Sequence, residues 1–442
     1  MNPSADNQSD LSDSEVNLPT EDSVTSADTT NNTDETTETD ETIEPGTKPT
    51  IEWHVGQGTN LEEHVHEGLQ TQDGGYLAIG DTQATSQNDQ LDDILIIKVD
   101  SNGDLEWQQK IGTAGVLETG IAILETPEND IIAGVGLSSS AAPNGMMKAT
   151  LLRLDSQGNL LWQQIYNHSG NGAIRGMTLL DNGDIVAVGY RQSPIGGYQF
   201  IADEAQGFIM QVDSSGALLW DSSLPVTQGT KVQPSGDGFM VLSTGWVFEN
   251  GIDTNAVFLI KTDSNGQEEW TKTYSSSGMN QAFDFDQTSD GGFAIAGHTT
   301  GYGSQNWDCL LIRTDNSGGL IWEATFGNPR GYNPLYVHDE CYGIREMPNG
   351  DLVMVGGTGD EYSYSENTHS SGSSDEWKAY VVRVNSNGTL QWEAVYGDNP
   401  NSGHNAAEFL TLTQDGGVML FNDTDSAGDM NPNNFGFMKL SP

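Results

Sequence analysis

The stretch that decides the fold is "DILIIKVDSNGDLEW", residues 93 to 107. A nearly continuous apolar run from Ile94 to Val99 is typical of a strand that is buried on both faces. Asp100 and Gly103 suit a tight turn, because an aspartate can bond the turn backbone and a glycine accepts a positive φ. After the turn, polar and apolar residues alternate up to Trp107, as in an edge strand. The stretch therefore predicts two antiparallel strands, the second at the edge of a sheet.

The same pattern recurs six times, and each copy ends in a tryptophan: Trp107, Trp162, Trp220, Trp270, Trp322 and Trp392. Each copy also has an earlier pair of strand-like runs, such as "HVHEGLQT" (64 to 71) and "YLAIG" (76 to 80), joined by a glycine-rich turn. Four short strands cannot bury both faces of their sheet alone, whereas a ring of such sheets can. We therefore predict an all-β fold, a β-propeller of four-stranded antiparallel blades.

The two ends of the repeat region complement each other. The last copy, residues 405 to 442, contains three strand-like runs and stops before its tryptophan. The isolated segment "TIEWHVG", residues 50 to 56, supplies one strand with Trp53. We predict that this segment pairs with the last strand, which gives seven blades and closes the ring.

Residues 1 to 49 form a segment of different composition. They contain 13 acidic residues, a single basic residue, Lys48, and no aromatic residue. Such a segment cannot bury enough apolar surface to offset its ordering entropy. The expected organisation is an acidic Thr/Ser/Asp/Glu-rich spacer over 1–49, predicted to be disordered, and a propeller over 50–442.

The overall charge restricts the partners. The chain has 442 residues, 64 of them acidic and 16 basic, with a formal net charge of -48. Nucleic acids and anionic membranes are polyanions and are therefore excluded as partners. No apolar run is long enough for a transmembrane helix. A spacer of this composition is typical of a tether, so we expect an extracellular or cell-surface protein with a lipid anchor upstream of this chain, the periplasm being the alternative.

The Asp-x-x-Gly-x-x-x-Trp pattern, as in Asp100 to Trp107, resembles the repeat of quinoprotein-like (PQQ-type) propellers and of related bacterial surface and lipoprotein propellers. The resemblance covers residues 50 to 442 and implies the propeller fold. The quinone enzymes of that family carry a vicinal disulfide, whereas Cys309 and Cys341 are 32 positions apart. The resemblance therefore implies no quinone, and we expect no required cofactor.

Long and variable loops point to one face of the ring. Two kinds of loop lie on that face: those between the second and third strands of a blade, and those between consecutive blades. Both kinds differ in every blade, and variable loops on a rigid scaffold usually carry binding residues. We expect a binding or scaffolding module with a protein or glycan ligand, because exposed aromatic residues suit both. The candidate ligand-binding residues on these loops are Trp307, Tyr332, Tyr336, Trp377, Tyr302, His298 and His404.

Two alternatives remain open. A polysaccharide lyase or hydrolase would use histidine, tyrosine and arginine on the same face, and Arg330, Tyr336 and His338 are the candidate catalytic residues. A structural subunit of a surface assembly is the second alternative.

An ion site and the cysteines give two further expectations. "DTDSAGD" (423 to 429) partly resembles a calcium loop, so Asp423, Asp425 and Asp429 are candidate ligands and calcium is the candidate ion. Cys309 and Cys341 are expected on strands of different blades. We predict two separate buried thiols, with an interblade disulfide as the alternative.

Overall fold

The structure is a computed structural model that describes residues 46–83, 92–112, 116–138, 146–166, 169–249, 252–331, 334–335, 337–359, 377–397, 403–425 and 433–442. The chain separates into two units, Met1–Glu44 and Pro45–Pro442, and all described residues belong to the second. Tyr332, Tyr336 and Asp429, three of the candidate residues, lie outside the described residues.

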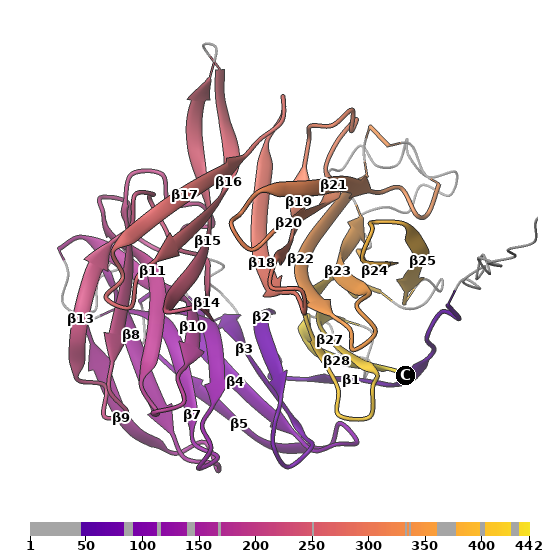
Figure 1. The fold of residues 1–442 in the computed structure, drawn as a ribbon. Helices are drawn as coiled ribbons and strands as arrows, with labels where there is room; N and C mark the ends of the chain where they lie inside the picture. Colours follow the sequence, from indigo (N-terminus) through magenta and orange to yellow (C-terminus); the bar gives the residue numbers. More distant parts are fainter. Residues whose placement is uncertain are drawn as a thin grey trace, which may run out of the picture. The chain divides into compact units, whose positions relative to one another are not determined.

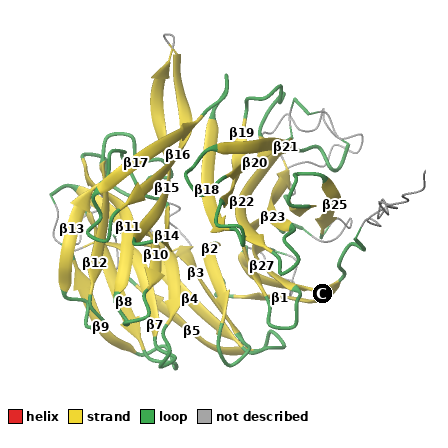
Figure 2. Ribbon diagram, viewed as in Figure 1, coloured by secondary structure: helices red, strands yellow, loops and turns green. Residues whose placement is uncertain are grey.

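The second unit is a seven-bladed β-propeller, as predicted. Its 28 strands form seven four-stranded antiparallel sheets arranged in a ring (Figure 1). The described residues contain strands, turns and loops without helices (Figure 2). Accordingly, the described part of the chain offers no helix of the length and apolarity that crossing a membrane requires.

Blades 1 to 6 each consist of four consecutive strands, numbered from the axis outward. Blade 1 contains β2 (Glu63–Gln70), β3 (Tyr76–Gln83), β4 (Asp92–Val99) and β5 (Leu105–Ile111). Blade 2 contains β6 (Thr119–Glu125), β7 (Ile131–Ser138), β8 (Met147–Leu154) and β9 (Leu160–Ile165). Blade 3 contains β10 (Asn171–Leu179), β11 (Ile185–Ser193), β12 (Gln206–Val212) and β13 (Leu218–Ser223). Blade 4 contains β14 (Lys231–Ser235), β15 (Gly238–Glu249), β16 (Ile252–Thr262) and β17 (Glu268–Tyr274). Blade 5 contains β18 (Asn280–Gln287), β19 (Phe293–Thr299), β20 (Asp308–Thr314) and β21 (Leu320–Phe326). Blade 6 contains β22 (His338–Glu346), β23 (Leu352–Gly359), β24 (Lys378–Val384) and β25 (Leu390–Tyr396).

Blade 7 is assembled from both ends of the propeller, which confirms the predicted ring closure. Its strand order is β26 (Ala407–Leu412), β27 (Val418–Thr424), β28 (Asn434–Leu440) and β1 (Ile51–Gln57). β1 runs antiparallel to β28, with His54 opposite Met438 and Val55 opposite Phe437. Because β1 is the outer strand of this sheet, the ring is held together by hydrogen bonds between distant parts of the chain.

The repeated tryptophan and the repeated turn glycine meet at six of the seven interfaces between blades; at the seventh, Trp392 faces blade 7, which has no turn between β28 and β1. A Cβ added to Gly103 would lie 2.8 Å from the Trp53 ring, and one added to Gly158 would lie 2.8 Å from Trp107. Both glycines have a positive φ, as the turn requires. The tryptophan of one blade therefore packs on the turn of the next blade. The remaining pairs are Trp162 with Gly216, Trp220 with Gly266, Trp270 with Gly318, and Trp322 with Gly388.

A basic residue at one repeat position has a structural role. The Lys98 ammonium is nearly buried and lies 3.1 Å from Asp73 in the turn between β2 and β3. Blade 3 has Gln211 at this position, and its amide donates to Asp184 at 2.7 Å. A cation in six blades, and the Gln211 amide in blade 3, therefore tie the third strand to the first turn of the blade. The equivalent pairs are Arg153 with Asp130, Lys261 with Asp237, Arg313 with Asp290, Arg383 with Asp351, and Lys439 with Asp415.

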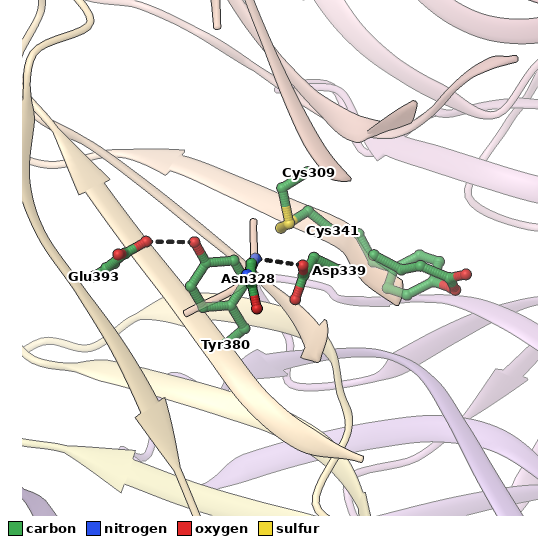
Figure 3. Close-up of a disulfide and its surroundings, with 8 residues drawn as sticks. Cys309, Asn328, Asp339, Cys341, Tyr380 and Glu393 are labelled. Atoms are coloured by element: carbon green, nitrogen blue, oxygen red, sulfur yellow. Dashed lines mark hydrogen bonds between the residues drawn. A yellow bond between two sulfur atoms is a disulfide. The ribbon is translucent and has the colours of Figure 1, made fainter. Parts of the chain in front are cut away.

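The prediction of two separate thiols is wrong. Cys309 on β20 and Cys341 on β22 form a disulfide between blades 5 and 6, with a Cα–Cα distance of 5.0 Å (Figure 3). The two strands belong to different sheets, but neighbouring blades pack face to face, so side chains that cross the interface come within disulfide reach. Both cysteines are fully buried in the apolar core that the two blades share.

Candidate functional site

A cavity of about 530 Å³ lies at the axis of the ring, on the face that carries the long loops. All seven inner strands, or the residues that lead into them, contribute to its wall. A second hollow of about 290 Å³ shares His64, Glu408 and Asp423 with the first, so the two form one continuous site. Cavities of this size are typical of small-ligand sites. We call the combined site the central cavity.

β-Bulges aim side chains into the central cavity. In six of the seven inner strands the register with the second strand shifts at one residue, which remains unpaired. A bulge turns the side chain of its extra residue away from the regular alternation. The bulged residues, all of which line the central cavity, are His66, Ile121, Arg175, Phe283, Tyr342 and Glu408.

Glycines in the second strands make room for four of these bulges, whereas Val135 and Asn422 occupy the corresponding positions at the Ile121 and Glu408 bulges. A Cβ on Gly80 would lie 2.0 Å from the His64 carbonyl oxygen, and one on Gly356 would lie 1.8 Å from that of Glu340. No real Cβ approaches a backbone oxygen so closely, so these positions require glycine whatever their φ. The recurrent glycine at the end of the second strand thus determines where cavity residues can project.

One wall of the central cavity contains a histidine and two carboxylates. His64 Nδ1 lies 2.5 Å from Asp423 Oδ2, and one ligand-type atom of each of His64, Glu408 and Asp423 lies within 4.8 Å of the others. The second carboxylate oxygen of Asp423 accepts the Val65 amide at 2.9 Å. These three side chains come from β2, β26 and β27 and are brought together by ring closure.

The charges on this wall influence one another. Burial disfavours the charged form of His64, but the adjacent Asp423 carboxylate outweighs this effect and raises the pKa of the imidazole to about 10. Burial raises the pKa of Glu408 to about 8, with His64 acting in the opposite direction and Asp423 in the same direction. Without a bound cation, the wall therefore favours the charged form of His64 and disfavours ionisation of Glu408.

A second histidine–carboxylate pair lies beside the first. His66 Nε2 is 3.1 Å from Asp81 Oδ2, and the rings of His64 and His66 are 4.7 Å apart. Asp81 also accepts hydrogen bonds from the Thr119 hydroxyl and the Gly120 amide. The carboxylate is therefore held in place by the neighbouring blade.

Aromatic side chains form another part of the wall. The loop between β11 and β12 carries Tyr198 and Phe200 into the cavity, where Arg175 donates to the Gln199 and Phe200 carbonyl oxygens. The Phe200 ring, which is 45 % exposed, lies 4.8 Å from the Phe283 ring. Arg175 thus fixes a long loop so that it presents an aromatic face to the cavity.

Glu340 supports the aromatic Tyr342 from behind. The Tyr342 hydroxyl donates to Glu340 at 2.6 Å, and His338 Nδ1 lies 3.1 Å from the other carboxylate oxygen. Burial opposes ionisation of Glu340, but the hydrogen bonds from His338 and Tyr342 lower its pKa to about 2. This carboxylate therefore stays charged and holds Tyr342 in one orientation.

Two ion pairs lie at the bottom of the cavity. Lys231 on blade 4 reaches Glu67 on blade 1 at 3.0 Å, and Arg345 on blade 6 pairs with Asp284 on blade 5. Both cations lie against the Phe409 ring, at 4.7 and 4.9 Å from its centroid. Because Lys231 and Glu67 come from blades that are not neighbours, their ion pair spans the axis.

Some of the candidate site residues predicted from the sequence line the central cavity, and others lie outside its lining. Trp377 and His404 line the central cavity, as does Asp423. His298 and Trp307 lie behind its wall, with ring centroids 4.8 Å apart, and both stand outside the lining. Tyr302 donates to Glu323 in blade 5.

The remaining candidates do not converge on the cavity within the described residues. His338 is 3 % exposed and bonds to Glu340, and Arg330 donates to the Thr358 carbonyl oxygen. Asp425 accepts the His404 amide at 2.7 Å instead of joining Asp423 and His64.

Several cavity residues were not singled out from the sequence. Asp81, Asp92, Phe283 and Tyr342 line the cavity but stand inside strand-like segments. A bulge places its residue in the cavity, and its local signal, present at four of the six bulges, is a glycine in the second strand opposite the residue before the bulge. The bulges at Ile121 and Glu408 lack this signal.

His298 makes stability depend on pH. Burial lowers the pKa of His298 to about 4; Glu340 acts to raise this pKa and His338 acts to lower it. In the unfolded chain a histidine titrates near 6.5. The folded state then binds fewer protons than the unfolded state between these values, so the free energy of unfolding should fall as pH falls from about 6.5 to about 4. Urea unfolding at several pH values should show a shallower decline for His298→Gln, a variant that can still bond to Gln281. Identical pH profiles for the variant and the wild type would contradict this assignment.

Comparisons with known proteins identify the fold and no family. No protein-family model and no curated protein matches the chain. The WD40 domain of Pan2 from Neurospora crassa is similar in structure, with a TM-score of 0.51 and 10 % identity over 89 % of this chain and 96 % of that one. A protein of unknown function from Bacteroides caccae has a TM-score of 0.41 and 13 % identity, covering 72 % of this chain and 93 % of that one. BBS1N, in complex with ARL6DN, has a TM-score of 0.46 and 10 % identity, covering 90 % and 97 %. At these identities the similarity shows the propeller fold alone.

Proposed function

We propose that the chain is a carbohydrate-binding protein that holds a neutral or amino-bearing oligosaccharide in the central cavity. The observation that carries this proposal is the combination of aromatic faces with hydrogen-bond acceptors on one cavity wall. Phe200, Phe283, Tyr342 and Trp377 offer ring faces to the C–H faces of sugars. Carboxylates between them accept hydrogen bonds from hydroxyl or ammonium groups.

The charge of the cavity supports the choice of sugar. Three cationic side chains reach the lining: His64 is paired with Asp423, Lys231 is paired with Glu67, and Arg175 is bound to backbone carbonyls. Negative groups outnumber them, so a uronate would be repelled and an amino sugar attracted. The carboxylates that line the cavity are Glu62, Glu63, Asp81, Asp92, Glu340, Glu408 and Asp423.

An exported location is part of the same proposal. The disulfide between Cys309 and Cys341 supports it, because disulfides persist mainly in oxidising compartments. Attachment to a cell surface through a lipid anchor remains a prediction from the composition of residues 1 to 49.

Calorimetric titration with chitosan hexaose, whose free amines are cationic, with cellohexaose and with hexagalacturonate tests the proposal. Binding of at least one of the first two is expected, and Phe200→Ala should weaken it at least tenfold, about 1.4 kcal/mol, because stacking on the ring is lost. Phe248→Ala is the control, since Phe248 is 72 % exposed and stands outside the cavity lining. Product analysis of the same mixtures distinguishes binding from cleavage by an enzyme. The proposal would be overturned if neither the uncharged nor the amino-bearing sugar bound, or if Phe200→Ala left the affinity unchanged.

A protein-binding role is the second candidate. β15 and β16 form a long hairpin that extends beyond the other strands of blade 4 (Figure 1). Trp246 and Phe248 are 43 % and 72 % exposed and lie two positions apart on β15, so they share one face of the hairpin. Exposed aromatic residues of this kind are common in protein interfaces.

A further inference from the structure

We propose that His64, Glu408 and Asp423 form a binding site for a divalent transition-metal ion, Zn²⁺ or Mn²⁺, in the wall of the central cavity. The proposal concerns the metal alone and does not depend on the carbohydrate ligand. It begins with the convergence of three ligand-type side chains from three strands.

The spacing of the ligand atoms fits one ion. Atoms bound to a common Zn²⁺ at about 2.0 to 2.3 Å are separated by roughly 3 to 4.5 Å. One atom each of His64, Glu408 and Asp423 already lies within 4.8 Å of the others. Coordination requires His64 Nδ1 and Asp423 Oδ2, now 2.5 Å apart, to separate by roughly 0.5 Å or more, so that the ion takes the place of the hydrogen bond between them.

Glu408 supplies independent support. Its carboxylate receives no hydrogen bond from any residue that the structure describes, although it lies at a bulge that aims it into the cavity. By contrast, the neighbouring carboxylate of Asp81 has three hydrogen-bond partners and that of Glu340 has two. A partly buried acid that the described residues leave without a donor is suited to an external cation.

The other two ligands are already held in place. Asp423 Oδ1 accepts the Val65 amide, which leaves Oδ2 directed at the His64 ring. His66 and Asp81 pack beside this ring and restrict its movement. The fold has already ordered these side chains, which favours binding. The ion displaces the proton between His64 and Asp423, so its affinity should rise with pH.

The donor set selects the type of metal. One imidazole nitrogen and two carboxylate oxygens suit Zn²⁺ or Mn²⁺, whereas Ca²⁺ and Mg²⁺ prefer oxygen ligands throughout. Three protein ligands also leave at least one coordination position for water or a bound molecule. The site would therefore have the composition of an open metal site in a ligand cavity.

The test uses the full chain after treatment with a chelator, titrated with ZnCl₂ and separately with MnCl₂ by calorimetry in the absence of sugars. One ion per chain is expected, and Glu408→Gln should weaken binding at least tenfold. This variant removes no hydrogen bond made to described residues, so it should fold. His64→Gln should have an effect at least as large.

Asp92→Asn is the matched control, because it replaces another acid of the same cavity by its amide without altering a proposed ligand. Its effect should be smaller than that of Glu408→Gln. Equal losses in the two variants would show diffuse attraction of cations to an acidic cavity and would overturn the proposal, as would the absence of stoichiometric binding of either metal. Because the titration contains no sugar, its outcome is separate from that of the carbohydrate experiment.

Discussion

Deletion of residues 46 to 57 is expected to destabilise the propeller more than any single substitution considered above. The deletion removes β1, and with it the hydrogen bonds to β28 and the packing of Trp53 on Gly103 and Tyr76. Loss of one large aromatic side chain from a core already costs about 3 to 5 kcal/mol. Loss of the whole strand should therefore approach the total stability of a typical domain, about 5 to 15 kcal/mol.

Urea unfolding followed by tryptophan fluorescence measures this effect. Deletion of residues 1 to 45 is the control, because none of the contacts described for β1 involves those residues. A synthetic peptide with the sequence of residues 46 to 57 should restore part of the lost stability by completing the sheet of blade 7. An unchanged unfolding midpoint after removal of β1 would show that the ring does not depend on this closure.

Replacing both cysteines by alanine, Cys309→Ala with Cys341→Ala, is expected to lower the free energy of unfolding by about 2 to 5 kcal/mol. The disulfide closes a loop with a sequence separation of 32, for which the loss of chain entropy in the unfolded state gives roughly 4 kcal/mol. It also joins blades 5 and 6 directly, so its removal should allow the two blades to separate earlier during unfolding.

The measurement compares urea unfolding with and without a reductant. The wild type should lose stability in the reductant, whereas the double variant should be insensitive to it and resemble the reduced wild type. A wild-type midpoint that does not change when the protein is unfolded and refolded under reducing conditions would contradict the prediction.

The repeated sequence pattern predicted most of the fold. Alternating strands, glycine turns and a tryptophan at each repeat end were sufficient to count seven blades and to assign Trp53 to the last one. The recurrent cation at Lys98 and its equivalents reinforces this pattern, because it joins the third strand to the first turn of the same blade. These features depend on contacts within one repeat or between neighbouring repeats, so each copy of the pattern confirms the others.

The site was predicted less completely. The loop face was expected to carry binding residues, and Trp377, His404 and Asp423 do line the central cavity that opens there. His338 and Arg330 are instead bonded within the walls of blade 6. A histidine or arginine near a loop can point inward or toward a neighbouring strand, and local sequence does not distinguish these orientations.

Local chemistry of the chain was enough to determine the number of blades, the order of strands and the closure of the ring, because turns and strand alternation act over a few residues and repeat. Only the tertiary structure decided which side chains meet. The disulfide requires the approach of two sheets, and the cluster of His64, Glu408 and Asp423 requires ring closure together with the Glu408 bulge. Such meetings depend on the radius of the ring and on side-chain direction, which no single repeat encodes.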